Sequence, residues 1–186
     1  MNRPPPGDDA ALVQRTIDGD HRAFAVLIER HRDSVFRFAG HYTGDPDEAL
    51  DITQESFANA YLAIGRYDRD RPFRTWLMRI AVNKCHDWSR RRRVRSFFSA
   101  ALPIEHATGI AADTAAPDDA TADRVELARV SAAIARLSAS LREVLILRTV
   151  DGLSQSETAQ ILRTSEKAVE NKLRRARRQL LQILSE

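Results

Sequence analysis

A stretch of small and acidic residues divides this chain into two parts. Residues 99–123 read SAALPIEHATGIAADTAAPDDATAD, with two prolines and no regular spacing of apolar residues. Such a composition is typical of a linker. Because the whole chain has only 186 residues, each flanking part can bury only a modest core. The sequence therefore predicts two small domains joined by a flexible linker.

The net charge follows the same division. Residues 1–95 and 124–186 carry net charges of +3 and +5, whereas residues 96–123 contain five acidic and no basic residues. We therefore place the first domain at 8–95, an acidic linker at 96–123 and the second domain at 124–186. Two basic lobes suit a partner with a phosphate backbone, although an ordinary solvated surface carries similar charge.

The spacing of apolar residues predicts an all-α fold for both domains. Apolar residues recur at helical intervals, and no segment alternates as a half-buried strand does. One helix is expected from Asp20, a suitable N-cap, to a break at Gly40 and Gly44. A second begins at Asp45 and Pro46 and runs to about Ile64. Its expected buried stripe is Leu50, Phe57, Tyr61 and Ile64.

The segment RPFRTWLMRIAVNKCHDWSRRRR, which starts at Arg71, predicts a third helix with two different faces. One face is an apolar stripe, so we expect Trp76 to pack in the core and not to stack on a base. That stripe consists of Phe73, Trp76, Leu77 and Ile80. The polar residues Arg74, Arg79, Asn83 and Lys84 are expected to face outward. The helix is expected to end in the arginine run 90–93, with Arg95 just beyond it.

The second domain has the pattern of a helix-turn-helix unit. An apolar helix stops at Gly152, and Ser154 with Glu157 three residues later forms a capping box. After a short turn, Ser165 can cap a longer basic helix. Its expected inward stripe is Val169, Leu173, Ala176 and Leu180. In such units the second helix enters the major groove of DNA.

In their order and spacing, these blocks resemble the extracytoplasmic function (ECF, group 4) sigma factors of the bacterial sigma-70 family. The resemblance rests on DEALDITQESFANAY, RPFRTWLMRIAVNK with its basic tail, and LREVLILRTVDGLSQSETAQILRTSEKAVENKLRRARRQL. It covers about residues 8–184. It implies an all-α chain with a sigma-2 helical bundle and a sigma-4 helix-turn-helix domain. The implied function is to bind core RNA polymerase, direct it to promoters and assist promoter melting.

The resemblance also assigns roles to residues. Binding to the polymerase β′ clamp helices is implied for Asp51, Gln54 and Glu55. Contact with the single-stranded −10 element is implied for Arg66, Tyr67, Asp68, Arg74, Arg79, Asn83, Lys84, Arg90 and Arg91. Contact with the double-stranded −35 element is implied for Lys167, Glu170, Asn171, Lys172, Arg174, Arg175 and Arg178.

The second domain also departs from the family pattern. Arg163 stands where glycine is usual, Ala168 where threonine is usual, and Asn171 with Lys172 replaces a Ser-Arg pair. These departures make the fold a safer inference than the bases that are read. We therefore infer no promoter consensus.

Further partners follow from the same resemblance. Such factors also contact the polymerase β flap, and many are held inactive by an anti-sigma factor, often anchored in a membrane. No cofactor or metal is expected. With one cysteine, Cys85, and no apolar run long enough to span a bilayer, the chain is expected to be cytoplasmic. Cys85 is a conceivable redox sensor, but a lone helical cysteine is usually packed.

The sequence was also compared with two other classes of function, a stand-alone transcription regulator and an enzyme. A stand-alone transcription regulator would explain the helix-turn-helix unit but would leave RPFRTWLMRIAVNK unexplained. An enzyme is disfavoured because the histidines show no metal-ligand spacing and the chain has no phosphate-binding glycine loop or nucleophile elbow. Adjacent Cys85 and His86 point in different directions on a helix and are poorly placed to share a ligand.

Overall fold

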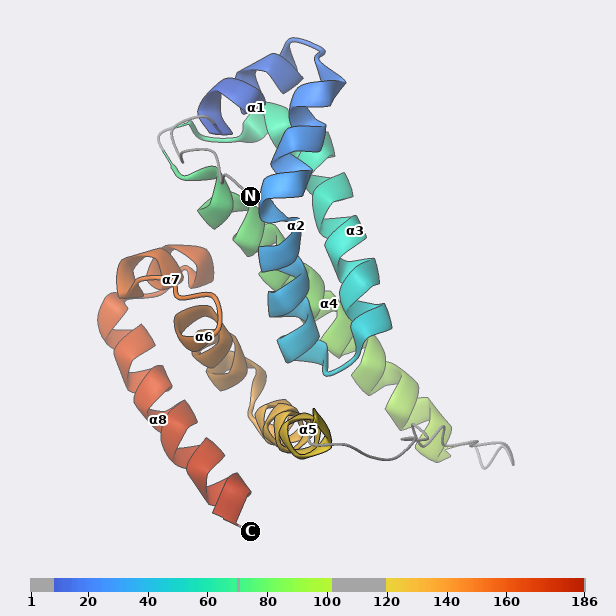
Figure 1. Cartoon of the computed structure of the whole chain (residues 1–186), viewed down its shortest axis with the longest axis vertical. Coiled ribbons are helices and arrows are strands. Elements are labelled where there is room, and N and C mark those ends of the chain that lie inside the picture. The colour runs from blue at the N-terminus through green and yellow to red at the C-terminus, as the bar shows by residue number, and fades with distance from the viewer. Residues whose placement is uncertain (1–8, 70, 102–119, 186) are drawn as a thin grey trace.

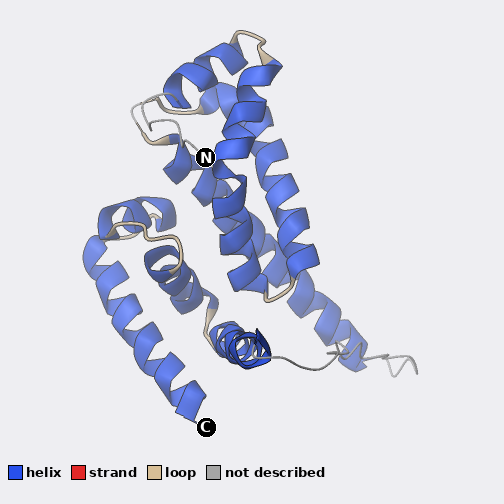
Figure 2. Cartoon of the chain, in the orientation of Figure 1, coloured by secondary structure: helices blue, strands red, loops and turns tan. Residues whose placement is uncertain are grey.

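The computed structural model describes residues 9–69, 71–101 and 120–185, and all regular structure in them is helical (Figures 1 and 2). The first domain comprises α1 (Asp9–Ile17), α2 (His21–Thr43), α3 (Pro46–Ala63), the 3-10 turn η2 (Ile64–Arg66) and α4 (Phe73–Ala101). The second comprises α5 (Ala120–Arg136), α6 (Ala139–Thr149), α7 (Gln155–Leu162) and α8 (Glu166–Ser185). The predicted all-α fold in two helical domains is confirmed. Most of the predicted linker, residues 102–119, lies outside the described residues.

Helices α2 and α3 begin at the predicted N-caps. The Asp20 carboxylate accepts a hydrogen bond from the Arg22 N–H at 3.0 Å. The Asp45 carboxylate accepts from the N–H groups of Asp47 and Glu48, at 2.9 and 3.2 Å. A cap of this kind contributes about 1 kcal/mol to stability. These aspartates therefore fix where two helices of the first domain start.

Two predicted helix ends were wrong. Gly40 lies inside α2, facing Ala49 of α3, and the helix turns only at Gly44, whose φ of +72° is left-handed. Helix α4 does not stop in the arginine run but continues to Ala101. Arginine is a good helix former, and no glycine or proline interrupts this stretch. The basic run is consequently a helical surface.

The buried side of α3 differs from the predicted stripe. Phe57 and Ile64 are buried as expected, but Leu50 and Tyr61 are exposed by 48% and 36%. The side that packs inward consists of Ala49, Ile52, Thr53, Ser56, Phe57 and Ala60. Small side chains allow α2 and α3 to approach closely, so most of the larger apolar residues of α3 lie elsewhere on the helix. Leu50 and Tyr61 are thereby left on the surface.

Helix α4 supplies much of the core of the first domain. Phe73 and Leu77 are buried, as predicted, while Trp76 and Ile80 are partly buried against the same core. Trp76 packs beside Phe73, with ring centroids 5.6 Å apart. Cys85 is fully buried, and its burial raises the pKa of the thiol. The structure thus supports packing roles for Trp76 and Cys85.

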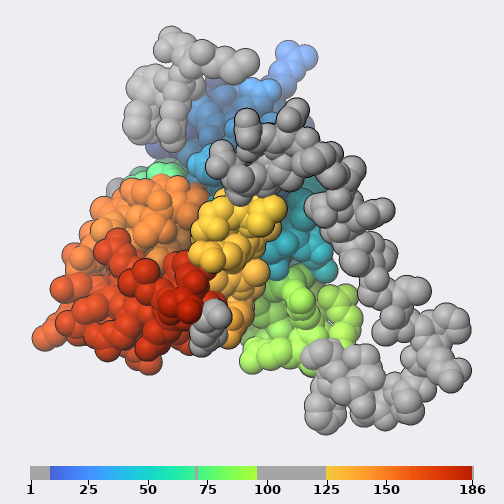
Figure 3. Space-filling model, turned by 60° about the horizontal axis from the view of Figure 1, so that its bottom comes forward, coloured from blue at the N-terminus to red at the C-terminus, as the bar shows by residue number. Residues whose placement is uncertain are grey.

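The two domains pack against each other. Figure 1 shows α6 and α7 beside α2 and α4, while α8 lies on the far side of the second domain. Figure 3 shows α5 between the rest of the second domain and the first domain. The apolar core is continuous across the two, since Trp88 and Tyr42 belong to the same cluster of buried residues as Leu141 and Leu145. This contact determines which faces of each domain remain exposed.

Candidate nucleic-acid interface

The second domain contains a well-formed helix-turn-helix. Ser154 Oγ accepts from the Glu157 N–H at 3.1 Å, and the Glu157 carboxylate accepts from the Ser154 N–H at 2.7 Å. Hydrogen bonding by Ser154 lowers the pKa of Glu157. Helix α7 ends at Arg163, which adopts a left-handed φ of +51° although it is not glycine. Ser165 Oγ then accepts from the Ala168 N–H at 3.2 Å, which caps α8.

Helix α8 has one apolar face and one charged face. Its inward stripe is confirmed, because Val169 and Ala176 are buried while Leu173 and Leu180 are partly buried against the core. All but one of the residues predicted to contact the −35 element are exposed, namely Lys167, Glu170, Asn171, Arg174, Arg175 and Arg178. The exception, Lys172, is half-buried. In the described part of the chain, no ion pair joins these cations to an acid.

A polar pocket of about 440 Å³ lies between α3 and α4 of the first domain. Its lining combines amide, charged and aliphatic groups: Asn59, Leu62, Ala63, Arg66, Ile80, Asn83, Lys84 and Asp87. Three of these, Arg66, Asn83 and Lys84, were predicted to contact the −10 strand. Asn83 is exposed, so its amide is available to donate and accept hydrogen bonds. The pocket can hold a polar, planar group against cations.

Three cations of α4 at or beside this pocket have acidic partners. Lys84 Nζ lies 3.1 Å from Glu55 Oε2, and Arg91 Nη2 lies 4.0 Å from Glu55 Oε1. Arg90 forms an ion pair with Asp87 one turn earlier on α4. Glu55 was predicted to contact polymerase, but here its carboxylate faces the cations of α4. A residue predicted to contact polymerase therefore pairs with cations predicted to contact DNA.

The other predicted −10 cations of α4 face the second domain. Arg74 Nη2 donates to the Asp151 carbonyl at 2.9 Å, and the Arg79 guanidinium donates to the Gln160 carbonyl. Both side chains are half-buried, so the expectation that they face solvent was wrong. Arg79 also lies near Arg163 and Arg71, and burial together with these like charges lowers its pKa. The residues of α4 that were predicted to contact the −10 strand thus lie on two different faces of the helix.

In the loop before α4, one residue predicted to contact the −10 strand is buried and two are exposed. Tyr67 is buried among aromatic rings, with its ring centroid 5.3 Å from that of Trp76, and its hydroxyl donates to the Arg71 carbonyl. Arg66 and Asp68 are exposed, and Asp68 forms an ion pair with Arg71 at 3.0 Å. In this conformation Tyr67 shapes the loop, while its neighbours face solvent.

An apolar groove of about 480 Å³ runs between α2 and α3. It is lined by Phe24, Ile28, Arg32, Leu50, Thr53, Gln54, Phe57, Ala58 and Tyr61. Gln54, one of the predicted polymerase contacts, lies in this lining, and Asp51 is exposed on the same helix. The groove explains the exposure of Leu50 and Tyr61. It offers an apolar surface to a partner at the place where the sequence predicts polymerase contact.

Sequence reasoning did not assign five residues of the polar pocket to a site: Asn59, Leu62, Ala63, Ile80 and Asp87. For Asp87 a signal was available, since it follows Asn83 by four residues and must share its side of α4. Leu62 carried no such signal; it is 83% exposed near the end of α3.

Other kinds of site find no support in the described residues. No group of three or more histidine, cysteine or acidic side chains there could hold a metal ion. Cys85 is not grouped with other ligand atoms and is buried. Among the described helices, none is long and apolar enough to cross a membrane.

Comparison with known proteins agrees with this geometry. Residues 27–95 match the family described as Sigma-70 region 2, and residues 127–180 match Sigma-70, region 4. The chain is 38% identical to the RNA polymerase sigma factor CnrH of Cupriavidus metallidurans, over 97% of this chain and 96% of CnrH. It is 30% identical to the ECF sigma factor SigW of Bacillus subtilis, over 90% and 92% of the two chains.

Solved structures give the same result. CnrH in complex with the cytosolic domain of CnrY superposes with a TM-score of 0.71 at 32% identity, covering 95% of this chain and 97% of that one. RpoE of Bartonella quintana, in complex with the anti-sigma factor NepR, has a TM-score of 0.67 at 23% identity, covering 87% and 96%, and supports the fold alone. The chain belongs to the sigma-70 family of transcription initiation factors, within the extracytoplasmic function group.

Proposed function

We propose that this chain directs core RNA polymerase to promoters by reading a duplex −35 element with α8 and a single-stranded −10 element with the pocket between α3 and α4. The observation that carries the proposal is the presence of both surfaces in one chain. One is an exposed cationic helix in a helix-turn-helix, and the other is a polar pocket beside a basic helix. Membership of a family of transcription initiation factors supports this interpretation of the two surfaces.

The −35 element would be read in the major groove. Exposed side chains near the start of α8, such as Lys167 and Asn171, would face base edges, while later cations such as Arg178 would contact phosphates. Arg174 and Arg175 lie between these groups and are exposed. An arginine can donate two hydrogen bonds to one guanine, which makes these two residues the main candidates for base discrimination.

The −10 element would be read after the strands separate. A base that leaves the stack loses a few kcal/mol of stacking and pairing, so the protein must offer it a shaped polar site. The Asn83 amide can form hydrogen bonds with a base edge, and Arg66 and Lys84 can attract the neighbouring phosphates. These three side chains line one pocket.

The groove between α2 and α3 would dock on the β′ clamp helices of polymerase. Leu50 and Tyr61 supply exposed apolar contact area, and Asp51 and Gln54 supply polar groups at its side. An apolar centre with polar groups around it is the usual anatomy of a protein interface. A second contact, between the second domain and the β flap, is implied by the family.

We also propose control by an anti-sigma factor. CnrH was solved in complex with the cytosolic domain of CnrY, and the Bartonella protein in complex with the anti-sigma factor NepR. A partner that covers the apolar groove would compete directly with polymerase. Action with polymerase would place this chain in the cytoplasm, and a membrane-anchored partner would hold it at the membrane surface.

In vitro transcription tests the central proposal. The chain is added to bacterial core polymerase and a pool of promoter fragments, and the transcript starts are sequenced. Discrete starts that depend on the chain are expected, with shared sequences about the −35 and −10 positions. If polymerase from the native host gives no such starts in the absence of any anti-sigma factor, the proposal fails and a stand-alone regulator becomes the better explanation.

A further inference from the structure

A pocket of about 530 Å³ lies between the helix-turn-helix and the start of α4 with the loop before it. Its charged and hydroxyl-bearing lining residues are Arg71, Arg79, Ser156, Arg163, Thr164 and Glu166. Among the described lining residues, three guanidinium groups thus accompany a single carboxylate. A volume of this size is usual for a small-molecule site. The pocket therefore has the charge and the size to hold a small anion.

Arg163 is the most unusual residue of this lining. It ends α7 with a φ of +51°, a conformation in which glycine is unstrained but a residue with a Cβ atom is not. No other non-glycine residue in the described part of the chain has a positive φ. The Arg163 side chain is exposed, and within the described residues it has no hydrogen bond or ion pair. A strained cation without an internal partner points to a function for its charge.

The other two guanidinium groups also have reason to bind an anion. Arg79 donates to the Gln160 carbonyl, but its Nε is buried without a hydrogen bond within the described residues. Arg71 pairs with Asp68 at 3.0 Å, yet its side chain remains 56% exposed. A buried donor without an acceptor costs free energy, and three neighbouring cations repel one another. An anion between them would accept from the donor and replace repulsion by attraction.

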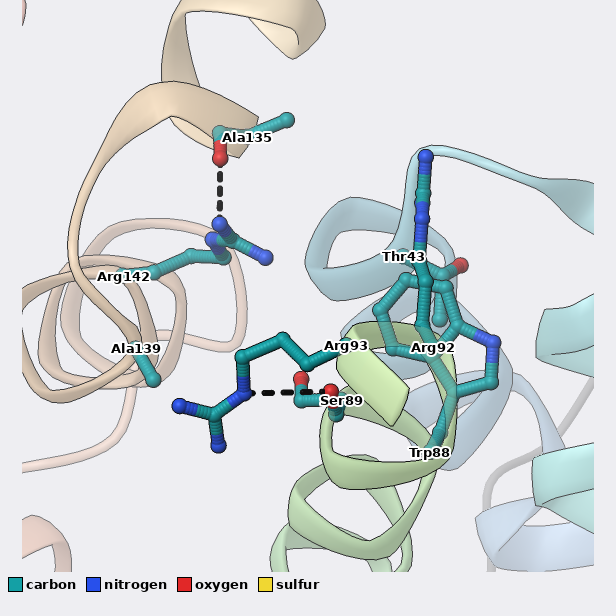
Figure 4. Close-up of a pocket in the computed structure, with 8 residues that line it drawn as sticks. All are labelled: Thr43, Trp88, Ser89, Arg92, Arg93, Ala135, Ala139 and Arg142. Atoms are coloured by element: carbon teal, nitrogen blue, oxygen red, sulfur yellow. Dashed lines mark hydrogen bonds between the residues drawn. The ribbon is translucent and has the colours of Figure 1, made fainter. Parts of the chain in front are cut away.

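A second pocket between the domains, of about 410 Å³, provides a comparison (Figure 4). It too is lined by three arginines, Arg92, Arg93 and Arg142. Arg142 donates to three main-chain carbonyl groups. Arg93 donates to the Ser89 carbonyl at 3.4 Å, and the Arg92 guanidinium lies 5.2 Å from the centroid of the Trp88 ring. Each of these guanidinium groups already has a partner in the chain, so this pocket contains no counterpart of Arg163.

We propose that the pocket lined by Arg71, Arg79 and Arg163 binds a small phosphate-bearing anion that carries more than one negative charge, such as a pyrophosphate group. The planar guanidinium groups would donate paired hydrogen bonds to phosphate oxygens. The hydroxyl groups of Ser156 and Thr164 can donate to further oxygens. One ligand would thereby contact both domains. The inference needs no role in promoter reading and goes beyond the proposed function.

Titration calorimetry of the full-length chain with sodium pyrophosphate, at constant ionic strength, tests the inference. The wild type should bind pyrophosphate, and Arg163→Gly should bind it about tenfold more weakly, because the variant lacks a charge-assisted donor. Glycine is unstrained at this φ, so Arg163→Gly should be at least as stable to heat as the wild type. A loss of binding then cannot be attributed to unfolding.

Two further variants locate the ligand within the molecule. Glu166→Gln removes the one carboxylate among the described lining residues, so it should strengthen pyrophosphate binding, by up to about fivefold. Arg93→Gln is the matched control, because it removes an arginine from the other pocket between the domains. Pyrophosphate affinity should be unchanged in Arg93→Gln. Opposite effects of Arg163→Gly and Glu166→Gln would place the anion in the pocket that both residues line.

The DNA backbone offers the same phosphate chemistry, and a second titration distinguishes the two sources. For a separate small ligand, the affinity for double-stranded DNA of arbitrary sequence should fall no more in Arg163→Gly than in Arg93→Gln. Pyrophosphate binding weaker than about 1 mM would overturn the inference. If Arg163→Gly alone then weakened DNA binding, Arg163 would contact the DNA backbone instead.

An equal loss of pyrophosphate affinity in Arg163→Gly and Arg93→Gln would also overturn the inference. Pyrophosphate would then be attracted by the general positive charge of the chain and not by a built pocket. None of these measurements involves transcription. Failure of the proposed function is therefore read separately, from the promoter assay.

Discussion

The two helices proposed to contact DNA, α8 and α4, differ in what their cations contact. On α8, no cation predicted to contact the −35 element forms an ion pair with an acid in the described structure, and all but Lys172 are exposed. On α4, by contrast, Lys84 and Arg91 face Glu55, Arg90 faces Asp87, and Arg74 and Arg79 donate to the second domain. The surface proposed to read the −35 element is therefore free of such partners, whereas the cations proposed to read the −10 element would first have to exchange theirs.

This difference matches the order in which the two elements become available. A duplex −35 element can be bound at any time, so a preformed cationic face is useful from the first encounter. The −10 strand exists only after melting. Cations with internal partners attract other nucleic acid less strongly, and their release can be coupled to polymerase binding and strand separation. The comparison therefore predicts larger losses from variants on α8 than gains from variants that free α4.

The largest effect is expected from Arg175→Ala. If Arg175 makes a bidentate contact with a base, its loss should weaken binding to the −35 duplex by about 1–3 kcal/mol. Titration of a labelled duplex measures the change. The matched control is Arg129→Ala, which removes an exposed cation of α5 that pairs with Glu126 at 3.2 Å. Equal, small effects for the two variants would place Arg175 on the solvated surface and remove the contrast between α8 and α4.

A smaller and more specific loss is expected from Asn83→Ala. Its amide should act only when a base is in the pocket, so promoter opening should fall about tenfold, as expected for the loss of roughly 1–1.5 kcal/mol of hydrogen bonding. Affinity for core polymerase should be unchanged. Fluorescence of a base analogue in the −10 element reports opening, and Gln182→Ala serves as an exposed amide control. Equal loss of opening and of polymerase binding would instead indicate a structural role for Asn83.

The sequence predicted those parts of the fold that depend on local chemistry. The N-caps at Asp20 and Asp45 and the capping box at Ser154 were predictable because a side chain and a nearby N–H define them. The inward stripe of α8 was predictable because it follows from helical spacing alone. The exposure of Leu50 and Tyr61 was not, because it depends on how closely α3 approaches α2.

The candidate site, like the fold, was predictable where it depends on residues close together in the sequence. Arg66, Asn83 and Lys84 were found from the sequence, and they do line one pocket. The partners of Arg74 and Arg79 could not be found, because Asp151 and Gln160 lie more than 70 residues away in the sequence. A local pattern can indicate that a residue is polar and faces outward. The pattern does not indicate which part of another domain will cover that residue.

Acidification should strengthen the contact between the two domains. Burial at this contact raises the pKa of Asp151 to about 6 from an ordinary value of 3.8, so docking of the domains takes up a proton and is favoured as the pH falls through 6. Between pH 7.5 and 5.5 the docking equilibrium should shift about fourfold by this linkage. The groups that face Asp151 are Ser34 and Arg37 of α2 and Arg74 of α4, and none of these changes charge in that range.

Energy transfer between labels at Ala25→Cys and Gln182→Cys, exposed positions in the two domains, measures this shift. Asp151→Asn is the matched control, because it keeps the shape of the side chain and removes its titration. Only the difference in pH response between the wild type and Asp151→Asn is assigned to Asp151. If the wild type and Asp151→Asn respond identically to pH, Asp151 does not gain a proton on docking and the burial argument is wrong.

The smallest effect is expected from Glu55→Gln, which tests the contrast between the helices most directly. Removing this charge should free Lys84 and Arg91 and raise the affinity for a −10 single strand by about 1.4- to fivefold, since ion pairs near the surface contribute about 0.2–1 kcal/mol. Salt should reduce this gain. The matched control is Asp33→Asn, because Asp33 is an exposed acid whose partner, Arg32, lies outside the −10 surface.

Polymerase binding distinguishes two roles of Glu55. If its carboxylate also contacts polymerase, Glu55→Gln should bind core enzyme less tightly while it binds the single strand more tightly. Docking on polymerase would then draw Glu55 away from α4 and release Lys84 and Arg91 for DNA at the moment they are needed. An unchanged strand affinity would show that the ion pairs of Glu55 do not limit DNA binding by α4. The contacts of Arg74 and Arg79 with the second domain would then be the remaining difference between α4 and α8.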